Sequence, residues 1–194
     1  MKSRQQRQRR RFFVACEGES EESFIKWISG LAEARNLNLH LHPVNLEGGG
    51  FRKMLEQAVI REARERKQNG PFRGRFLLLD ADRVADDPWS IEKLRTEAGQ
   101  NGFTTILQQP NFEGVLLRMH EGCERDFLCK AATESRLKSR WPHYRKAMDA
   151  LELARKFNLE DLLRAGRADP FLAELLKRLG FAIQPRPHGC HTAR

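Results

Sequence analysis

The chain has 194 residues, of which 40% are hydrophobic and 31% are charged, and its formal net charge is +9. This length fits one domain with a small addition, and the hydrophobic content is sufficient for a core. No segment approaches the roughly 20 apolar residues of a membrane span, and the first apolar run is too short for a signal peptide, so we expect no membrane partner. The four cysteines show no CxxC spacing, which indicates reduced thiols in a cytoplasmic protein.

Positive charge is concentrated at the beginning of the chain. Residues 1–11 contain six Lys and Arg side chains and no acidic residue. A basic, Gln-rich segment of this kind is predicted to be a disordered arm. Its arginines, including Arg9, Arg10 and Arg11, would bind the phosphates of a nucleic acid without reading its sequence. The alternative is a tail that only increases solubility.

Short apolar runs alternate with amphipathic segments between residues 12 and 108. Buried strands are predicted at two apolar runs, 12–16 and 76–79, and a further strand is predicted near 103–108. A less buried strand is expected over 37–46, at a sheet edge because of Pro43. Helices are predicted at three amphipathic segments: 20–31, 51–67 and 89–98. This alternation is typical of a mostly parallel, Rossmann-like α/β sheet flanked by helices.

The character of the chain changes after Pro110. Asn111 is expected to open a helix, and residues 121–183 are predicted to form a helical C-terminal region that packs on the α/β domain of residues 12–120, with 184–194 as a tail. Five basic residues in this region are expected to be exposed: Arg136, Lys138, Arg140, Arg145 and Lys146. They either line a substrate groove or form an ordinary solvated helix face.

Carboxylates follow two of the predicted strands. Glu17 comes directly after the first strand, and Asp80 and Asp82 follow the strand at 76–79. Open α/β sheets bind ligands outside the carboxyl ends of their strands, and Mg²⁺ takes one or two carboxylates together with substrate phosphates. If the two strands are neighbours, the three carboxylates converge, which is costly unless a cation lies among them. In the alternative interpretation, Asp80 caps the next helix and Asp82 pairs with Arg83.

These motifs resemble those of the TOPRIM domain, which topoisomerases, primases and small metal-dependent nucleases share. The matching residues are Glu17-Gly18 after an N-terminal strand and Asp80-Ala81-Asp82 after a later one. Residues 109–117, QPNFEGVLL, are similar to the Asn-Pro-x-Phe-Glu-x-Trp-Leu-Leu segment of the RloB-like family. Those proteins are compact TOPRIM proteins associated with restriction and phage-defence loci. The chain departs from that segment where Asn and Trp are usual, with Gln and Val in their places.

The resemblance implies a metal-dependent nuclease that acts on DNA or RNA. Asp80 and Asp82 would hold Mg²⁺ or Mn²⁺, and Glu17 would be a further ligand or a proton-transfer group. Glu113 would either complete a second metal site or cap a helix. Arg83 would either contact a phosphate or pair with one of the acids at positions 86 and 87.

Three other acids near the first site motif are interpreted differently. Glu19, Glu21 and Glu22 are expected to be acids of a first helical turn, which complement the helix dipole, and not ligands.

Two other functions are left open by the sequence. RloB-like proteins resemble nuclease components that work with a separate ATPase, so the chain is alternatively a non-catalytic or partner-activated nucleic-acid-binding subunit. A strand ending in DAD also occurs in nucleotide-sugar transferases, where the metal binds a diphosphate. Glu17-Gly18 and the basic arm argue against that class. A homodimer would suit the cutting of two strands.

Overall fold

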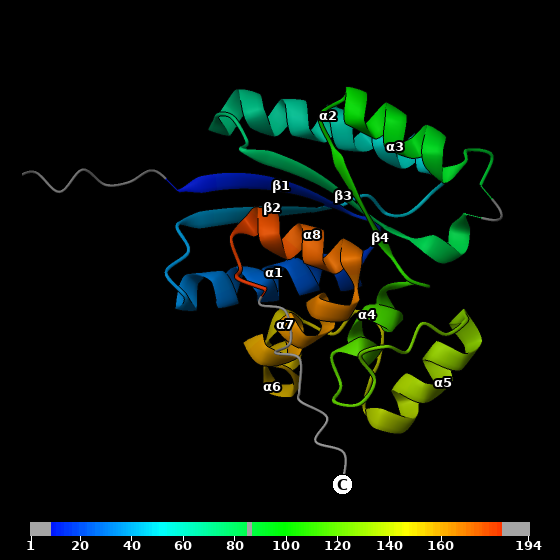
Figure 1. Cartoon of the computed structure of the whole chain (residues 1–194). Coiled ribbons are helices and arrows are strands. Elements are labelled where there is room, and N and C mark those ends of the chain that lie inside the picture. The colour runs from blue at the N-terminus through cyan, green and yellow to red at the C-terminus, as the bar shows by residue number, and fades with distance from the viewer. Residues whose placement is uncertain (1–8, 85–86, 184–194) are drawn as a thin grey trace, which may run out of the picture.

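The computed structural model of the protein describes residues 9–84 and 87–183 (Figure 1). Within them one sheet is formed by β1 (Arg10–Cys16), β2 (Leu39–Asn45), β3 (Gly74–Asp80) and β4 (Thr104–Gln108). All neighbouring strands are parallel, and their order is β2-β1-β3-β4. The predicted parallel α/β sheet and the edge position of β2 are therefore confirmed. Most of the predicted arm, Asp86 and the predicted tail lie outside the described residues.

Helices connect the strands and cover both faces of the sheet. They are α1 (Glu19–Ala34), α2 (Phe51–Asn69), α3 (Ile91–Gln100), α4 (Phe112–Arg118), α5 (Lys130–Arg140), α6 (Ala150–Lys156), α7 (Leu159–Ala168) and α8 (Pro170–Leu179). A short 3-10 helix, Ala81–Arg83, follows β3. Helices α2 and α3 cover one face, and α1 and α8 cover the other (Figure 1). None of the described helices is long and apolar enough to cross a bilayer.

The central strands are apolar on both sides, because helices cover both faces of the sheet. Phe12 and Val14 of β1 pack in a cluster with α1 and the C-terminal helices, whereas Phe13 and Ala15 pack against α2 and α3. Successive side chains of a strand point to opposite faces. A strand buried on both faces therefore reads as a continuous apolar run, which is the pattern that predicted it.

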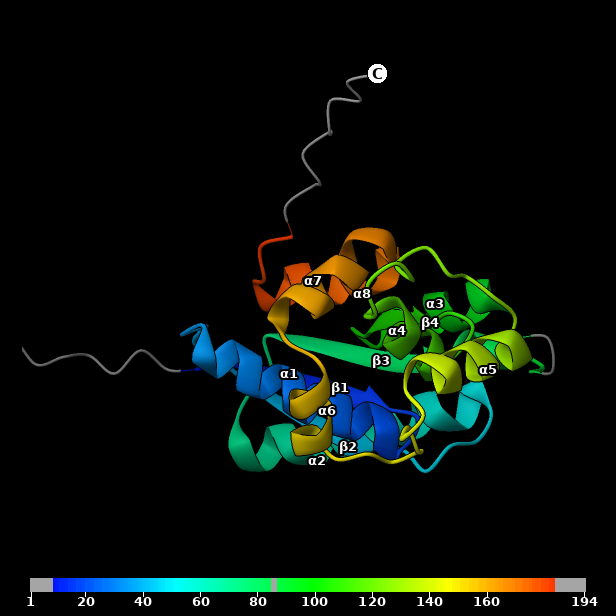
Figure 2. The same cartoon turned by 90° about the horizontal axis from the view of Figure 1, so that it is seen from below.

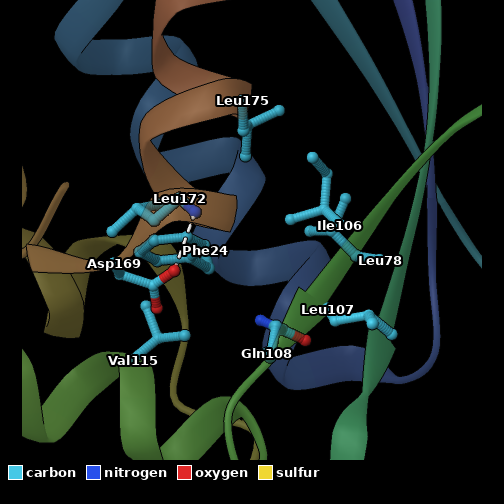
Figure 3. A pocket seen from close by; sticks show the side chains of 9 residues that line it. All are labelled: Phe24, Leu78, Ile106, Leu107, Gln108, Val115, Asp169, Leu172 and Leu175. Carbon is cyan, nitrogen blue, oxygen red and sulfur yellow. Dashed lines mark hydrogen bonds between the residues drawn. The ribbon is translucent and has the colours of Figure 1, made fainter.

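The C-terminal helices share a hydrophobic core with the sheet. Leu172 and Leu175 of α8 belong to the same cluster as Leu78 and Ile106, and these side chains face one another around a small cavity (Figure 3). Helix α6 lies against α1, and α4 lies against α5 (Figure 2). The helical C-terminal region is therefore an integral part of the fold.

The C-terminal region is less continuously helical than predicted. Residues 141–149, hereafter the 141–149 segment, separate α5 from α6 without helical structure. Pro142 cannot continue a helix because it lacks the backbone N–H, and Ala147 has a left-handed φ of 57°. The interruption lets this part of the chain leave the helical layer.

Strand β1 begins two residues earlier than predicted, so that Arg10 and Arg11 belong to the sheet and not to the arm. Arg10 Nη2 donates a hydrogen bond to the carbonyl oxygen of Leu179 at 3.4 Å. Arg11 Nη1 donates to the carbonyl oxygens of Asn69 and Gly70, the latter at 2.7 Å. Both guanidinium groups are thus bound to helix ends.

Candidate metal centre

The carboxyl ends of β1 and β3 define the candidate site. From β1 the chain moves outward to β2 on one side and then returns to β3 on the other side. The strand order reverses between these two strands, and such switch points are where open α/β sheets bind ligands. Cys16 pairs with Leu78 in the parallel register, so that Glu17 and Asp80 leave the sheet at nearly the same level.

Three of the four predicted acids lie around one pocket. Glu17, Asp80 and Glu113 line an open pocket of about 440 Å³. Glu17 Oε2 accepts a hydrogen bond from the backbone N–H of Asp80 at 3.1 Å. Asp80 Oδ1 accepts one from the backbone N–H of Phe112 at 2.9 Å. Because Phe112 is the first residue of α4, this bond brings the start of α4, and with it Glu113, to the end of β3.

The turn between β4 and α4 fixes this approach. Asn111 caps α4 as predicted, since its side chain accepts a hydrogen bond from the backbone N–H of Gly114 at 3.2 Å. The carbonyl oxygen of Pro110 accepts one from the backbone N–H of Asp82 at 2.7 Å. A Cβ atom on Gly114 would lie 2.2 Å from the carbonyl oxygen of Gln109, so only glycine allows the turn to pack so closely.

Two cations are bound to the predicted ligands. Arg83 Nε lies 2.6 Å from Glu17 Oε1, and Lys130 Nζ lies 2.8 Å from Asp82 Oδ2. Asp82 does not line the pocket, since its carboxylate is turned to Lys130. The alternative in which Asp80 caps the next helix and Asp82 pairs with Arg83 is wrong. Asp80 makes no side-chain cap on the 3-10 helix that follows it, Asp82 is paired with Lys130, and Arg83 is paired with Glu17.

Of the two acids offered as alternative partners of Arg83, Asp86 lies outside the described residues and Asp87 is bound elsewhere. The carboxylate of Asp87 instead accepts hydrogen bonds from the backbone N–H groups of Phe51 at 2.7 Å and Trp89 at 2.8 Å. Arg83 lines the pocket, so this predicted phosphate-binding residue is at the site.

Glu21 is an acid of the site that the sequence analysis assigned only to a helix start. It lines the same pocket and is 5% exposed. Its Oε2 accepts a hydrogen bond from the backbone N–H of Gly18 at 3.2 Å. The sequence contains a signal for this burial, because Glu21 stands three, four and seven residues before Phe24, Ile25 and Ile28. That spacing places Glu21 on the buried stripe of the helix.

Residues 144–147 of the 141–149 segment lie beside the pocket, and Lys146 lines it. The Tyr144 hydroxyl donates a hydrogen bond to Glu113 Oε1 at 3.1 Å, and Lys146 Nζ lies 3.7 Å from the same oxygen. The backbone N–H of Ala147 donates to Ser20 Oγ at 3.1 Å. Helix α1 begins at Glu19 with Gly18 as its N-cap, so Ser20 binds this segment instead of opening the helix as predicted.

The other predicted nucleic-acid-binding residues do not reach the pocket. Arg9, Arg10 and Arg11 lie at the amino end of β1, about 20 Å from its carboxyl end at the usual rise of a strand. Arg9 Nη2 lies 3.5 Å from Glu33 Oε1 on α1. The structure therefore separates these arginines from Arg83.

Burial and crowding raise the pKa values of the pocket acids. Burial raises the pKa of Asp80 to about 8, and the charges of Glu21, Glu17, Asp82 and Glu113 add to this. Burial, followed by repulsion from Glu17, raises the pKa of Glu21 to about 7. Burial also raises the pKa of Glu17, although the N–H of Asp80 and the charge of Arg83 oppose it. Buried acids that crowd together and whose pKa values are raised are a feature of functional sites.

The donors suit Mg²⁺ or Mn²⁺ in chemical type, since hard cations prefer carboxylate oxygens. Across residues 9–84 and 87–183, however, no three His, Cys, Asp or Glu side chains are close enough together to hold a metal ion. The ion pairs of Glu17 with Arg83 and of Asp82 with Lys130 keep these two carboxylates engaged. For Glu17, Asp80 and Asp82 to coordinate one metal ion, Arg83 and Lys130 would have to release the carboxylates of Glu17 and Asp82.

Comparison of the chain with protein-family models, with curated proteins and with solved structures gave no match. The resemblance to TOPRIM and RloB-like proteins therefore rests on the residues that carry the motifs. The fold and the site define the chain as an α/β protein with an acidic pocket at the switch point of its sheet.

Proposed function

We propose that the protein is a Mg²⁺- or Mn²⁺-dependent nuclease of the TOPRIM, RloB-like type that hydrolyses phosphodiester bonds of DNA or RNA in the cytosol, within a restriction or phage-defence system. The observation that supports this most is the convergence of Glu17, Glu21, Asp80 and Glu113 on one pocket beside two central strands. Buried acids with raised pKa values in a pocket are candidates for catalysis or metal binding.

The residues of the pocket have separate roles in this proposal. Asp80, Asp82 and Glu17 hold the metal, which when bound would neutralise phosphate charge and orient the attacking water. Glu113 is held by Tyr144 and provides a further carboxylate on the other side of the pocket.

Basic side chains are available to hold a nucleic acid beside the pocket. Arg83 and Lys146 line it. Lys130 reaches Asp82 from the start of α5. Exposed Lys138 and Arg140 follow in the last turn of the same helix. Lys and Arg side chains along such a path would attract a phosphate backbone, which favours the groove interpretation of these residues.

A second candidate is a nuclease that is inactive until a partner, such as an ATPase, binds. The ion pairs of Arg83 with Glu17 and of Lys130 with Asp82 favour it, because they neutralise two metal ligands in the protein on its own. Here a partner would shift the site toward the arrangement in which those carboxylates are released.

The test is a cleavage assay on labelled duplex DNA, single-stranded DNA and tRNA with Mg²⁺, Mn²⁺ or EDTA. Asp80→Asn and Glu17→Gln should each reduce metal-dependent cleavage by about a hundredfold or more, since metal stabilisation of a transition state is worth several kcal/mol. Asp149→Asn is the control, because Asp149 is an exposed cap of α6.

The assay also separates the two candidates. Cleavage by the isolated protein supports the first. Absence of cleavage together with Mn²⁺ binding that requires Asp80, measured by calorimetry, supports a partner-activated subunit. If calorimetry shows no Mn²⁺ binding, both proposals fail and the acids have a structural role.

A further inference from the structure

A buried ion pair joins α4 to the C-terminal helices. Arg118, in the last turn of α4, is 0% exposed, and its Nη2 lies 2.5 Å from Oδ2 of buried Asp169. Its guanidinium group also lies over the ring of Phe127, 4.6 Å from the centroid. Desolvation of two charges is costly, so a buried pair is weak evidence for stability alone. Its other contacts indicate what the pair does.

Asp169 connects the pair to α8. Its second oxygen, Oδ1, accepts hydrogen bonds from the backbone N–H groups of Phe171 and Leu172, both at 3.0 Å, and thereby caps the helix. Asp169 lies between Leu172 of α8 and Val115 of α4 (Figure 3). The orientation of this carboxylate therefore depends on how α8 packs against the sheet.

Arg118 connects the pair to the candidate metal centre. Its Nη1 donates a hydrogen bond to the carbonyl oxygen of Gln109 at 2.6 Å. The carbonyl oxygen of the next residue, Pro110, accepts the N–H of Asp82, and the N–H of Phe112 donates to Asp80. The turn of residues 109–112, hereafter the 109–112 turn, thus donates or accepts a hydrogen bond with both Asp80 and Asp82. Arg118 binds the same turn through the carbonyl oxygen of Gln109.

We propose that Arg118 and Asp169 are positioning residues of the candidate metal centre, which use the packing of the C-terminal helices to fix the 109–112 turn against Asp80 and Asp82. The part of this proposal that concerns metal binding rests on the proposed function. Neither Arg118 nor Asp169 is among the residues that line the pocket, and the 109–112 turn connects the pair to Asp80 and Phe112, which do line it. Outer partners of this kind typically change metal affinity by about 10- to 100-fold.

The charges can be removed while the cap of α8 is kept. Asp169→Asn retains an N-cap acceptor but leaves the buried Arg118 without a counter-ion. Arg118→Met combined with Asp169→Asn removes both charges and also the hydrogen bond to Gln109. A buried pair replaced as a whole is tolerated far better than one that loses a single partner. Asp149→Asn is the matched control, because Asp149 caps α6 through the same type of bonds at an exposed position.

The experiment measures melting temperature, the Mn²⁺ dissociation constant by electron paramagnetic resonance, and amide exchange at Asp82 and Phe112 by NMR. The double variant should remain folded, bind Mn²⁺ about tenfold or more weakly, and exchange both amides faster than the wild type. Asp149→Asn should remain folded, with the Mn²⁺ affinity and the amide exchange of the wild type. A folded double variant with wild-type Mn²⁺ affinity and wild-type exchange overturns the proposal.

The amide measurement keeps the two proposals distinguishable. If the wild type binds no Mn²⁺, the proposed metal site fails. In that case the positioning role is still supported if the amides of Asp82 and Phe112 exchange faster in the double variant than in the wild type. Unchanged exchange would overturn the positioning role.

Discussion

The two ends of the sheet carry charged residues of opposite sign in very different settings. At the amino end, Arg10 and Arg11 donate hydrogen bonds to carbonyl oxygens at the C-termini of α8 and α2, and Arg11 also lies over the ring of Phe72, 4.4 Å from the centroid. At the carboxyl end, Asp80 and Glu21 are buried beside other acids, and their pKa values are raised.

The difference shows which charges serve the fold. Cations at helix C-termini complement the helix dipole and satisfy free carbonyl groups, so the amino end is electrostatically balanced. The crowded acids oppose folding, and a chain retains such groups where a ligand or reaction needs them. The contacts of the charged residues at each end distinguish a structural role from a candidate functional one.

The largest predicted effect concerns pH and Asp80. Its folded pKa of about 8 lies above the usual value of 3.8, so between pH 4 and 8 the folded state holds a proton that the unfolded state has lost. The free energy of unfolding therefore falls as pH rises through this window. We expect the wild type to lose about 2 kcal/mol relative to Asp80→Asn, measured by urea denaturation in EDTA from pH 5 to pH 8.

Asp149→Asn serves as the control here, because its exposed carboxylate lies away from the pocket. If the free energies of unfolding of wild type and Asp80→Asn differ by a constant amount across this pH range, the pKa of Asp80 is not raised by folding.

The second largest effect is expected on comparing Glu21 with the next residue of the helix, Glu22. Glu21→Gln should weaken Mn²⁺ binding by about tenfold, as the loss of one carboxylate near a hard cation would, and should raise the melting temperature in EDTA. Glu22→Gln, which only removes an ion pair with Lys26, should change neither. Calorimetry and thermal denaturation measure both. If the two variants have the same Mn²⁺ affinity and the same melting temperature, Glu21 is only an acid of the first helical turn.

The smallest effect is expected at the amino end. Arg11→Met removes its bonds to the end of α2 and its contact with Phe72, which should reduce the free energy of unfolding by about 1 kcal/mol. Nucleic-acid affinity, measured by fluorescence anisotropy at fixed salt, should not change. A clear loss of affinity with unchanged stability would show that Arg11 acts as part of a basic arm.

The sequence was sufficient for the main features of the fold. The apolar runs of β1 and β3 required cover on both faces, and Pro43 in β2 indicated an edge strand. The start of β1 was missed because Arg10 and Arg11 read as part of a charged arm. Their aliphatic stems and hydrogen bonds to distant helix ends allow them to extend a strand.

The site residues that directly follow an apolar strand could be predicted from the sequence. Glu17 and Asp80 follow apolar strands, and parallel strands bring such positions to one edge. The contacts of Tyr144 and Asp169 could not be predicted, because they join segments far apart in sequence. Glu21 was accessible in principle, since its helical spacing to Phe24 and Ile28 marks a buried stripe.

The position of α8 has a consequence for synthesis on the ribosome. Its leucines cover Leu78 and Ile106, and Asp169 at its start pairs with Arg118. The leucines of α8 and Asp169 are synthesised after all four strands. A nascent chain that has reached α4 already contains every acid of the pocket, but it lacks α8, which covers one face of the sheet together with α1. The pocket can take its final form only after α8 has emerged from the ribosome.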